Sequence, residues 1–328
     1  MQSTSTQTLA QTLAQTLAEL QLQGLDRLDA QLLLVHVLCQ PSHQRGWLLA
    51  HDTDMLALAP AARLKTLTMR RLTGEPLAYL TGHKEFFGLD LQVDARVLVP
   101  RPDTETLVDW ALAVLHAPPE TPSTQTDRRA LPQNSDLVEG QAEKVQIHPL
   151  GGQHVLDLGT GSGAIALALK ASSPTLQVHA VDLSAEALVV AEANAQHLQL
   201  EVSFSQGTWF EGLTNTACAF DCIVSNPPYI AARDPHLEAL IHEPLNALAS
   251  GPDGLDDLRH IIAEAPKHLK PGGWLLLEHG YDQAQAVQDL LARAGFHKTQ
   301  SRRDLNGIER CSGGQHEPLC PDTDDLLP

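Results

Sequence analysis

A short apolar run, a glycine-rich turn and a helix-forming run follow one another without a break in this sequence. His154–Leu158 has the length and composition of a buried strand, Gly159–Gly163 reads G-T-G-S-G, and Ala164–Lys170 favours a helix. In open α/β sheets this order brings the backbone close to a ligand and points the helix N-terminus at it. The turn alone is weak evidence for any one ligand, since many nucleotide-binding folds share it, but it indicates an open sheet of the α/β class.

Strand-like and helix-like segments alternate around this turn. The expected strands cover 154–158, 177–182, 201–205, 221–225 and 274–278, and the expected helices cover 104–115, 164–170, 184–196, 255–269 and 282–294. Ser184 is the expected N-cap of one helix, and Pro271-Gly272-Gly273 is expected to end another. This order predicts a doubly wound, mostly parallel sheet with helices on both faces.

Polar residues at two strand ends indicate what the sheet binds. Asp182 ends a strand, where a carboxylate can accept hydrogen bonds from both ribose hydroxyls of an adenosine, although an NAD enzyme would use the same device. Asn226-Pro227-Pro228-Tyr229 follows the 221–225 strand. The Asn side-chain oxygen and a backbone carbonyl held by the prolines can each accept a hydrogen bond from one NH2 group, and the Tyr ring can cover the flat group that carries it. Asn-Pro and Pro-Pro also occur in plain turns.

The combined pattern resembles that of S-adenosylmethionine-dependent methyltransferases that act on conjugated nitrogens: D-x-G-x-G-x-G at 157–163, an acid at 182 and N-P-P-Y at 226–229. The chain resembles the release-factor glutamine methyltransferases more widely, over roughly residues 25 to 315 apart from one insertion. The segments that carry this resemblance are 75–82, 85–88, 99–105, 243–248, 254–255, 277–280 and 304–310. The resemblance implies a seven-stranded, Rossmann-like methyltransferase sheet preceded by a small helical N-terminal domain.

The resemblance also implies a reaction. Such a family member transfers a methyl group from S-adenosyl-L-methionine to the side-chain amide nitrogen (N5) of the glutamine in the Gly-Gly-Gln motif of class 1 peptide chain release factors. An amide nitrogen is a poor nucleophile because its lone pair is delocalised into the carbonyl group. Two acceptors aimed at its N–H groups return electron density to nitrogen and stabilise the positive charge that develops during transfer.

Candidate site residues follow from matching these motifs. Cofactor-binding residues are expected at Gly159, Thr160, Gly161, Ser162, Gly163, Asp182, Trp209 and Asn226. Catalytic and substrate-binding residues are expected at Asn226, Pro227, Pro228 and Tyr229, with Arg101 and Glu105 as further substrate-pocket or scaffold residues and Glu243 at the pocket edge. Trp209 fits a core position equally well. No histidine is assigned as a base, and His279 is expected to be structural.

Three other functions stay open at this point. N-P-P-Y also serves enzymes that methylate the exocyclic amino group of adenine in DNA, and a sister family methylates a glutamine of a ribosomal protein. A chain that keeps the fold can also be a non-catalytic binding module. The net charge of −18 disfavours DNA, because binding to phosphate backbones is driven by Lys and Arg. The sequence at 101–105 matches the release-factor version of the signature, which disfavours the ribosomal substrate.

Composition bears on the compartment and on metal content. The five cysteines provide neither a disulfide framework nor a four-ligand zinc site, so we expect a reducing compartment and no metal. No stretch approaches the roughly 20 apolar residues of a membrane span, and the N-terminus lacks the character of a signal peptide. We therefore expect a cytoplasmic monomer that binds release factors and contacts neither nucleic acid nor membrane directly.

The chain divides into four expected parts. Residues 1–84 form a helical N-terminal substrate-recognition domain, 85–100 a β-hairpin linker, 101–316 the methyltransferase domain and 317–328 a loose tail. Residues 117–152 are rich in Pro, Ser, Thr, Gln and Asp and are predicted to be a disordered insertion. In the first part, leucines at 9, 13 and 17 recur at helical spacing and are expected to face a core.

Overall fold

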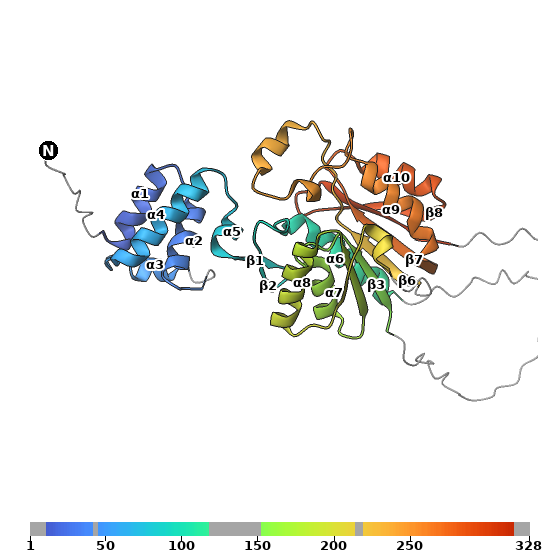
Figure 1. Cartoon of the computed structure of the whole chain (residues 1–328), viewed down its shortest axis with the longest axis horizontal. Helices are drawn as coiled ribbons and strands as arrows, with labels where there is room; N and C mark the ends of the chain where they lie inside the picture. Colours follow the sequence, from blue (N-terminus) through green and yellow to red (C-terminus); the bar gives the residue numbers. More distant parts are fainter. Residues whose placement is uncertain (1–10, 42–44, 118–151, 214–218, 318–328) are drawn as a thin grey trace, which may run out of the picture.

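The computed structural model describes residues 11–41, 45–117, 152–213 and 219–317. Figure 1 shows a helical region near the N-terminus, joined through a small hairpin to a larger α/β domain. The helices of the helical region are α1 Leu13–Leu22, α2 Arg27–Val37, α3 Trp47–Ala50, α4 Leu58–Leu72 and α5 Leu77–Thr81. The helical character predicted for the N-terminal part is therefore confirmed for the described residues.

Capping and a leucine core hold the helical region together. The Thr12 hydroxyl accepts a hydrogen bond from the Gln15 N–H, and the Gln15 side chain accepts one from the Thr12 N–H, so α1 begins with a capping box. Leu13 is buried in the core and Leu17 packs against it, as the predicted leucine stripe requires. Leu9, the first leucine of that stripe, lies outside the described residues.

The short helix α5 takes part in two hydrophobic clusters. Leu80 is buried in the core of the helical region. Ala78 and Tyr79 belong to a second cluster, together with Val97 and with residues of α8 Ala185–Leu198 in the larger domain. One turn of helix therefore connects the two parts of the molecule through buried apolar contacts.

A hairpin is present, but its two antiparallel strands, β1 His83–Phe86 and β2 Leu89–Gln92, span residues 83–92 and not the predicted 85–100. Its turn residues Phe87 and Gly88 have φ values of 50° and 78°, and two such residues in sequence match the twist of a two-residue hairpin. The buried side chain of Asn194 in α8 accepts a hydrogen bond from the Gln92 N–H (2.7 Å) and donates one to the Gln92 carbonyl (3.0 Å). The hairpin is thereby fixed to the larger domain.

The larger domain is built on a seven-stranded sheet with the order β5-β4-β3-β6-β7-β9-β8. Its strands are β3 His154–Leu158, β4 Gln177–Asp182, β5 Ser203–Gln206, β6 Phe220–Ser225, β7 Leu269–Glu278, β8 Phe296–Arg303 and β9 Glu309–His316. The pairs from β5 to β7 are parallel, and β9 runs antiparallel to both of its neighbours. The predicted doubly wound, mostly parallel sheet is confirmed.

Helices cover both faces of this sheet, as Figure 1 shows. α6 Glu105–His116, α7 Ala164–Ser172 and α8 pack on one face, and α9 Asp256–Glu264 and α10 Ala284–Arg293 pack on the other. Side chains alternate between the two cores along each strand, so Val155 lies in the first core and Leu156 in the second. Ser184 caps α8 as predicted, since its hydroxyl accepts a hydrogen bond from the Ala187 N–H.

Several boundaries differ from the sequence prediction. Helix α9 ends at Glu264, and a 3-10 turn with Pro266 follows it, because proline lacks the N–H that would continue the helix. Pro271-Gly272-Gly273 therefore does not end a helix. It lies inside β7, whose register against β6 shifts between Phe220 and Cys222. Strands β8 and β9 were not located individually in the sequence.

Two predicted segments fall largely outside the described residues. These are the insertion at 117–152 and the tail at 317–328, of which 118–151 and 318–328 are not described. No helix in the described part of the chain is both long and apolar enough to cross a membrane.

Candidate functional site

A pocket lies at the carboxyl ends of the parallel strands, where open α/β sheets bind ligands. Among the predicted site residues, its lining includes Gly159, Gly161, Asp182, Trp209, Asn226 and Pro228. These residues follow or end four different strands, and the parallel sheet brings them to one edge. Several other lining residues were not among the predicted site residues: Arg96, Val97, Leu98, Leu183, Thr208, Asn246 and Asp257.

The glycine-rich turn is held by backbone and carboxylate contacts. The N–H groups of Gly159 and Thr160 donate to the Val181 carbonyl at 2.8 and 3.1 Å. The Thr160 hydroxyl donates to Asp157 Oδ2 at 2.6 Å, and the Ala166 N–H donates to the same oxygen at 3.2 Å. Asp157 is fully buried, and this burial raises its pKa to about 7. The buried carboxyl group of Asp157 therefore holds the turn in place beneath the pocket.

Asp182 connects this turn to the next strand. Its Oδ2 accepts a hydrogen bond from the Gly161 N–H (2.8 Å), and its Oδ1 accepts one from the Ser184 N–H (2.9 Å). Burial raises the pKa of Asp182, and the backbone hydrogen bonds oppose that shift. Each carboxylate oxygen has a further lone pair, so the residue can still accept hydrogen bonds from two hydroxyl groups of a ligand.

Trp209 combines a pocket position with an unusual backbone. Its φ is 50°, a left-handed value that costs energy for a bulky side chain. A Cβ atom on Gly159 would lie 3.3 Å from the Trp209 ring, and Gly159 itself has a φ of 72°. The ring therefore packs directly on the first glycine of the turn. It also packs against the core on the α9 and α10 face, so both sequence interpretations describe part of its environment.

The tetrapeptide Asn226–Tyr229 is held at both ends. The Asn226 side-chain Nδ2 donates to Thr104 Oγ1 at 3.2 Å, and the Tyr229 hydroxyl donates to Glu278 Oε1 at 3.3 Å. Thr104 precedes α6 and Glu278 ends β7, so two elements distant in sequence position the loop. The preceding residue, Ser225, donates its hydroxyl to the Leu158 carbonyl at 2.7 Å and ties β6 to β3.

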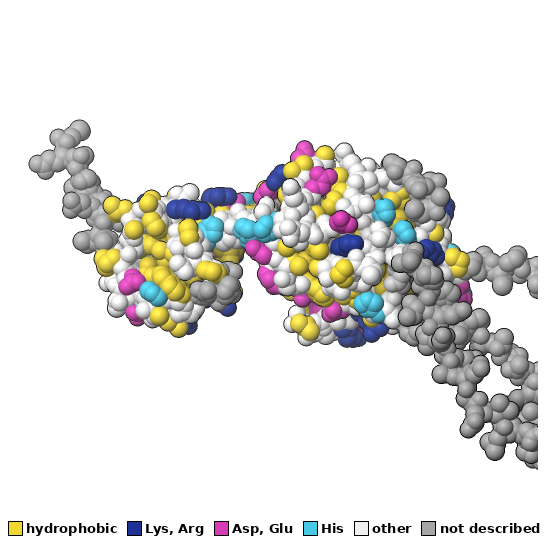
Figure 2. Space-filling model, turned by 90° about the horizontal axis from the view of Figure 1, so that it is seen from below, with side chains coloured by type: hydrophobic (Ala, Val, Ile, Leu, Met, Phe, Trp, Pro, Cys, Tyr) yellow, Lys and Arg dark blue, Asp and Glu magenta, His cyan; other side chains and the backbone are white. Residues whose placement is uncertain are grey.

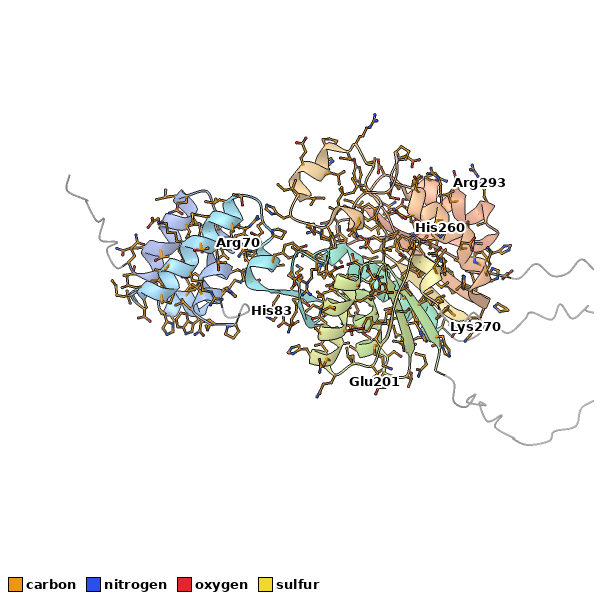
Figure 3. All side chains as sticks on the ribbon, viewed as in Figure 1. Arg70, His83, Glu201, His260, Lys270 and Arg293 are labelled. Carbon is orange, nitrogen blue, oxygen red and sulfur yellow. The ribbon has the colours of Figure 1, made fainter. Side chains whose placement is uncertain are left out.

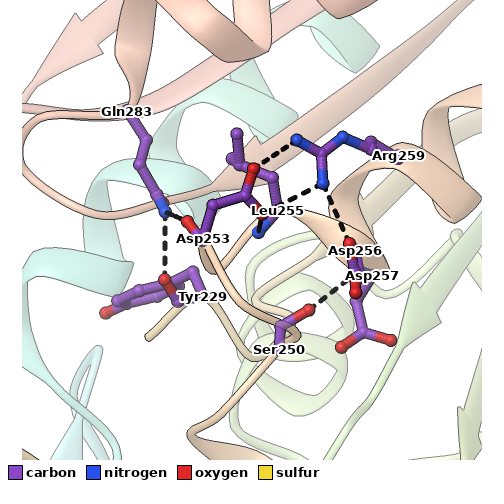
Figure 4. A network of polar contacts seen from close by, with 8 residues as sticks. All are labelled: Tyr229, Ser250, Asp253, Leu255, Asp256, Asp257, Arg259 and Gln283. Atoms are coloured by element: carbon purple, nitrogen blue, oxygen red, sulfur yellow. Dashed lines mark hydrogen bonds and ion pairs between the residues drawn. The ribbon is translucent and has the colours of Figure 1, made fainter. Parts of the chain in front are cut away.

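Figure 4 shows the polar network behind this loop. Gln283 Nε2 donates to the Tyr229 carbonyl at 3.0 Å and to the Asp253 carbonyl at 3.4 Å. Arg259 pairs with Asp253 and closes the turn that precedes α9. A Cβ atom on Gly254 would lie 2.2 Å from the Tyr229 carbonyl oxygen, so only glycine fits there. Gln283 and Gly254 therefore contact the backbone carbonyl of Tyr229, whereas its ring hydroxyl has a separate partner in Glu278.

Arg101, Glu105 and Glu243 do not line the pocket. Arg101 forms an ion pair with Glu243, whose Oε2 also accepts a hydrogen bond from the Val99 N–H at 3.1 Å. Glu105 Oε1 accepts a hydrogen bond from the Phe87 N–H at 3.1 Å, in the turn of the hairpin. The side chains of Arg101, Glu105 and Glu243 therefore connect segments of the chain that are distant in the sequence.

His279 is fully buried and has two polar partners. Its Nδ1 lies 2.8 Å from the Gly280 carbonyl oxygen, so this nitrogen carries a proton, and its Nε2 lies 2.8 Å from Ser312 Oγ. Burial lowers the pKa of this imidazole. A neutral imidazole with a hydrogen-bond partner at each ring nitrogen suits the structural role expected from the sequence.

On the face in Figure 2, Lys and Arg side chains are scattered and do not gather into one patch. In the part of the chain that the structure describes, no three or more His, Cys, Asp or Glu residues are grouped so that they could hold a metal ion.

Known proteins resemble this chain in sequence and in fold. The family described as "Methyltransferase small domain" matches residues 142–301, and "PrmC N-terminal domain" matches residues 11–82. The chain is 46% identical to the release factor glutamine methyltransferase of Bordetella pertussis, over 89% of this chain and 95% of the relative. It is 41% identical to that of Vibrio cholerae, over 91% and 93% respectively. The solved hMettl16 catalytic domain, in complex with MAT2A 3′UTR hairpin 1, shares the fold at a TM-score of 0.50 and 14% identity, over 79% of this chain and 83% of that one.

Proposed function

Since this chain belongs to the release factor glutamine methyltransferase family, we propose that it transfers a methyl group from S-adenosyl-L-methionine to the N5 amide nitrogen of the glutamine in the Gly-Gly-Gln motif of class 1 peptide chain release factors. One observation carries the proposal beyond the family name. The pocket lined by Gly159, Asp182 and Trp209 is also lined by Asn226 and Pro228. A donor bound there would therefore lie beside the Asn226–Tyr229 loop, which we call the amide-binding loop because it is the proposed site for the substrate amide.

The residues of the pocket fit an adenosyl sulfonium compound. Gly159 and Gly161 have left-handed φ values, which favour glycine, and glycine has no Cβ atom to keep a ligand away from the backbone. Asp182 keeps free lone pairs for ribose hydroxyls, and the Trp209 ring offers a flat apolar surface for a purine. Thr160, Ser162 and Gly163 complete the turn that would carry the methionine end. When bound, the donor supplies a methyl group on a positively charged sulfur, with the leaving group already in place.

The protein's contribution to the reaction is mainly to position the two reactants. Asn226 Oδ1 and the Pro227 carbonyl oxygen are the proposed acceptors for the two N–H groups of the glutamine amide. Together they would hold the amide nitrogen toward the donor and stabilise the charge that develops on it. Pro228 fixes the loop, and the Tyr229 ring covers the amide plane. The proton leaves after the methyl group has been transferred, so no side chain is assigned as a strong base.

Arg101, Glu105 and Glu243 remain proposed contributors to the substrate pocket through the segments they connect. The substrate is a translation factor, so we expect the reaction to take place in the cytoplasm. The DNA alternative is not favoured by the acidic composition, and the relatives' names do not favour the ribosomal-protein alternative.

Transfer of labelled methyl groups from S-adenosylmethionine to a purified release factor tests this function. Parallel reactions contain the factor with its Gly-Gly-Gln glutamine changed to alanine, a ribosomal protein with a methylatable glutamine, and duplex DNA. We expect label on the unchanged factor alone. Label only on the ribosomal protein or on DNA would show that this molecule, and not the release factor, is the substrate. Cofactor binding without label on any substrate would favour a non-catalytic binding module.

A further inference from the structure

Two chain segments in the wall of the pocket lie away from the strand ends that carry the predicted site residues. The first consists of residues 96–98, which follow the hairpin, and the second includes residues 244, 246 and 247, between β6 and α9. The two segments are joined where the Glu243 carboxylate accepts a hydrogen bond from the Val99 N–H at 3.1 Å. Because neither segment lies in a strand of the sheet, contacts from neighbouring elements must hold them in place.

The helical region contacts the first segment through a buried tyrosine. Tyr79 in α5 is 9% exposed, and its hydroxyl donates to the Val97 carbonyl at 2.5 Å. Burial raises the pKa of this hydroxyl, so it stays protonated and able to donate. The ring packs in the cluster that also contains Val97 and Ala187, and both of these residues line the pocket. If the buried carbonyl lost this donor, it would move toward another partner, and the pocket wall would move with it.

A histidine connects the helical region to the second segment. His242 Nε2 lies 3.0 Å from the Thr73 carbonyl oxygen, which can only accept, so this nitrogen carries a proton and donates it. Thr73 is the C-cap of α4, where carbonyl groups have no partner inside the helix. The residue after His242 is Glu243, which joins the two segments. The bond from His242 is exposed to water, so we expect it to contribute less than the buried bond from Tyr79.

We propose that Tyr79 and His242 are positioning residues through which the helical region holds the wall of the cofactor pocket. The inference rests on the proposed function, because it concerns the pocket assigned to S-adenosylmethionine. It gives the helical region a part in cofactor binding, in addition to the substrate recognition expected from the sequence.

The groups that act on the substrate amide should be unaffected by these two contacts. The amide-binding loop follows β6, and its ends have their own partners in Thr104 and Glu278. A shifted wall should therefore weaken cofactor binding while the bound cofactor still reacts at its normal rate. A tyrosine that only filled its cluster would behave differently, because loss of its hydroxyl would lower stability and leave cofactor affinity unchanged.

Tyr79→Phe tests the proposal, because phenylalanine keeps the ring in its cluster and removes only the hydroxyl. We expect the dissociation constant of S-adenosylmethionine to rise by about 3- to 10-fold in isothermal titration calorimetry. The kcat of methyl transfer at saturating cofactor and release factor should change by less than about twofold. Tyr281→Phe is the matched control: Tyr281 is 66% exposed, and its replacement should leave both quantities unchanged.

His242 offers a second test in which the fold is not at risk, since its contact is exposed. His242→Ala should raise the dissociation constant of S-adenosylmethionine by about two- to fivefold. His242→Gln, whose side-chain NH2 can donate to the Thr73 carbonyl, should recover most of the affinity. His236→Ala is the control, because His236 is an exposed histidine of the same connection that pairs with Asp234, and this variant should bind the cofactor normally.

The outcomes separate this inference from the proposed function. An unchanged dissociation constant in Tyr79→Phe, equal losses of affinity in His242→Ala and His242→Gln, or a fall in kcat as large as the loss of affinity would each overturn the inference alone. An unmodified chain that binds the cofactor but methylates no release factor would overturn the proposed function and leave the inference standing. An unmodified chain that does not bind S-adenosylmethionine would overturn both.

Discussion

Replacing Arg101 or Glu243 tests whether their ion pair stabilises the pocket wall or whether Arg101 contacts the substrate. The Glu243 side chain is 2% exposed and accepts hydrogen bonds from the Val99 N–H and from Arg101, whose own side chain is 40% exposed. Arg101→Met would leave this buried carboxylate with a single backbone donor. The segment that follows Glu243 contributes Pro244, Asn246 and Ala247 to the pocket, so a disturbed carboxylate should also disturb that wall.

The expected magnitude follows from the burial of the two partners. Removing one member of a fully buried ion pair costs about 3–5 kcal/mol, whereas exposed pairs contribute about 0–1 kcal/mol. Solvent screens part of the interaction on the Arg101 side, and Glu243 keeps the Val99 N–H. We therefore expect Arg101→Met to lower the free energy of unfolding by about 1–3 kcal/mol. The affinity for S-adenosylmethionine should fall by about 3- to 10-fold, since about 1.4 kcal/mol corresponds to a tenfold change.

Urea denaturation and isothermal titration calorimetry measure both quantities. Arg101→Met/Glu243→Gln should lose less stability than the sum of the two single variants, because no buried charge is left unpaired. Arg70→Met removes an exposed pair with Glu75 in the helical region, where Figure 3 labels Arg70, and should cost no more than about 1 kcal/mol. If Arg101→Met leaves stability and cofactor affinity unchanged but raises the KM for the release factor, the ion pair does not stabilise the pocket wall, and Arg101 contacts the substrate.

Three further predictions concern the pocket itself. Asn226→Ala should lower kcat by about 100-fold or more with little change in the dissociation constant of S-adenosylmethionine; equal losses in both would mean that Asn226 is chiefly a cofactor contact. Asp182→Asn should weaken cofactor binding by about 10- to 100-fold in calorimetry, because the new NH2 must face a backbone N–H donor; unchanged affinity would contradict this. Burial raises the pKa of Asp157 from 3.8 to about 7, so the contribution of this acid to stability is present below about pH 4 and lost as the pH rises toward 7. The free energy of unfolding of the unmodified chain relative to Asp157→Asn should therefore fall by about 3 kcal/mol over that range in urea titrations, and a flat difference would exclude the shift.

The sequence predicted those parts of the site that depend on local order. Gly159–Gly163, Asp182 and Asn226–Tyr229 each follow or end a strand, and parallel strands necessarily bring their carboxyl ends to one edge. The local pattern was therefore sufficient to place them together. The same reasoning located β3, β4 and β6 to within a residue or two.

The supporting residues could not be predicted in this way. Thr104 and Asn226 are 122 residues apart, and nothing in either segment shows that they share a hydrogen bond. Asn194 looks like an ordinary polar residue of a helix until the fold places Gln92 and the Ser162 carbonyl against it. Both Thr104 and Glu278 lie in segments that carried the family resemblance, but their hydrogen bonds to Asn226 and Tyr229 join elements that are distant in the sequence.

The one-turn helix α5 has a consequence for how a protein substrate is chosen. Because Leu80 belongs to the core of the helical region and Tyr79 to the cluster around α8, the two parts cannot swing freely without exposing apolar surface at that joint. A factor that docked on the helical region would thus meet the pocket at a fixed separation. The enzyme would then select a glutamine by its distance from the docking surface as well as by its flanking sequence.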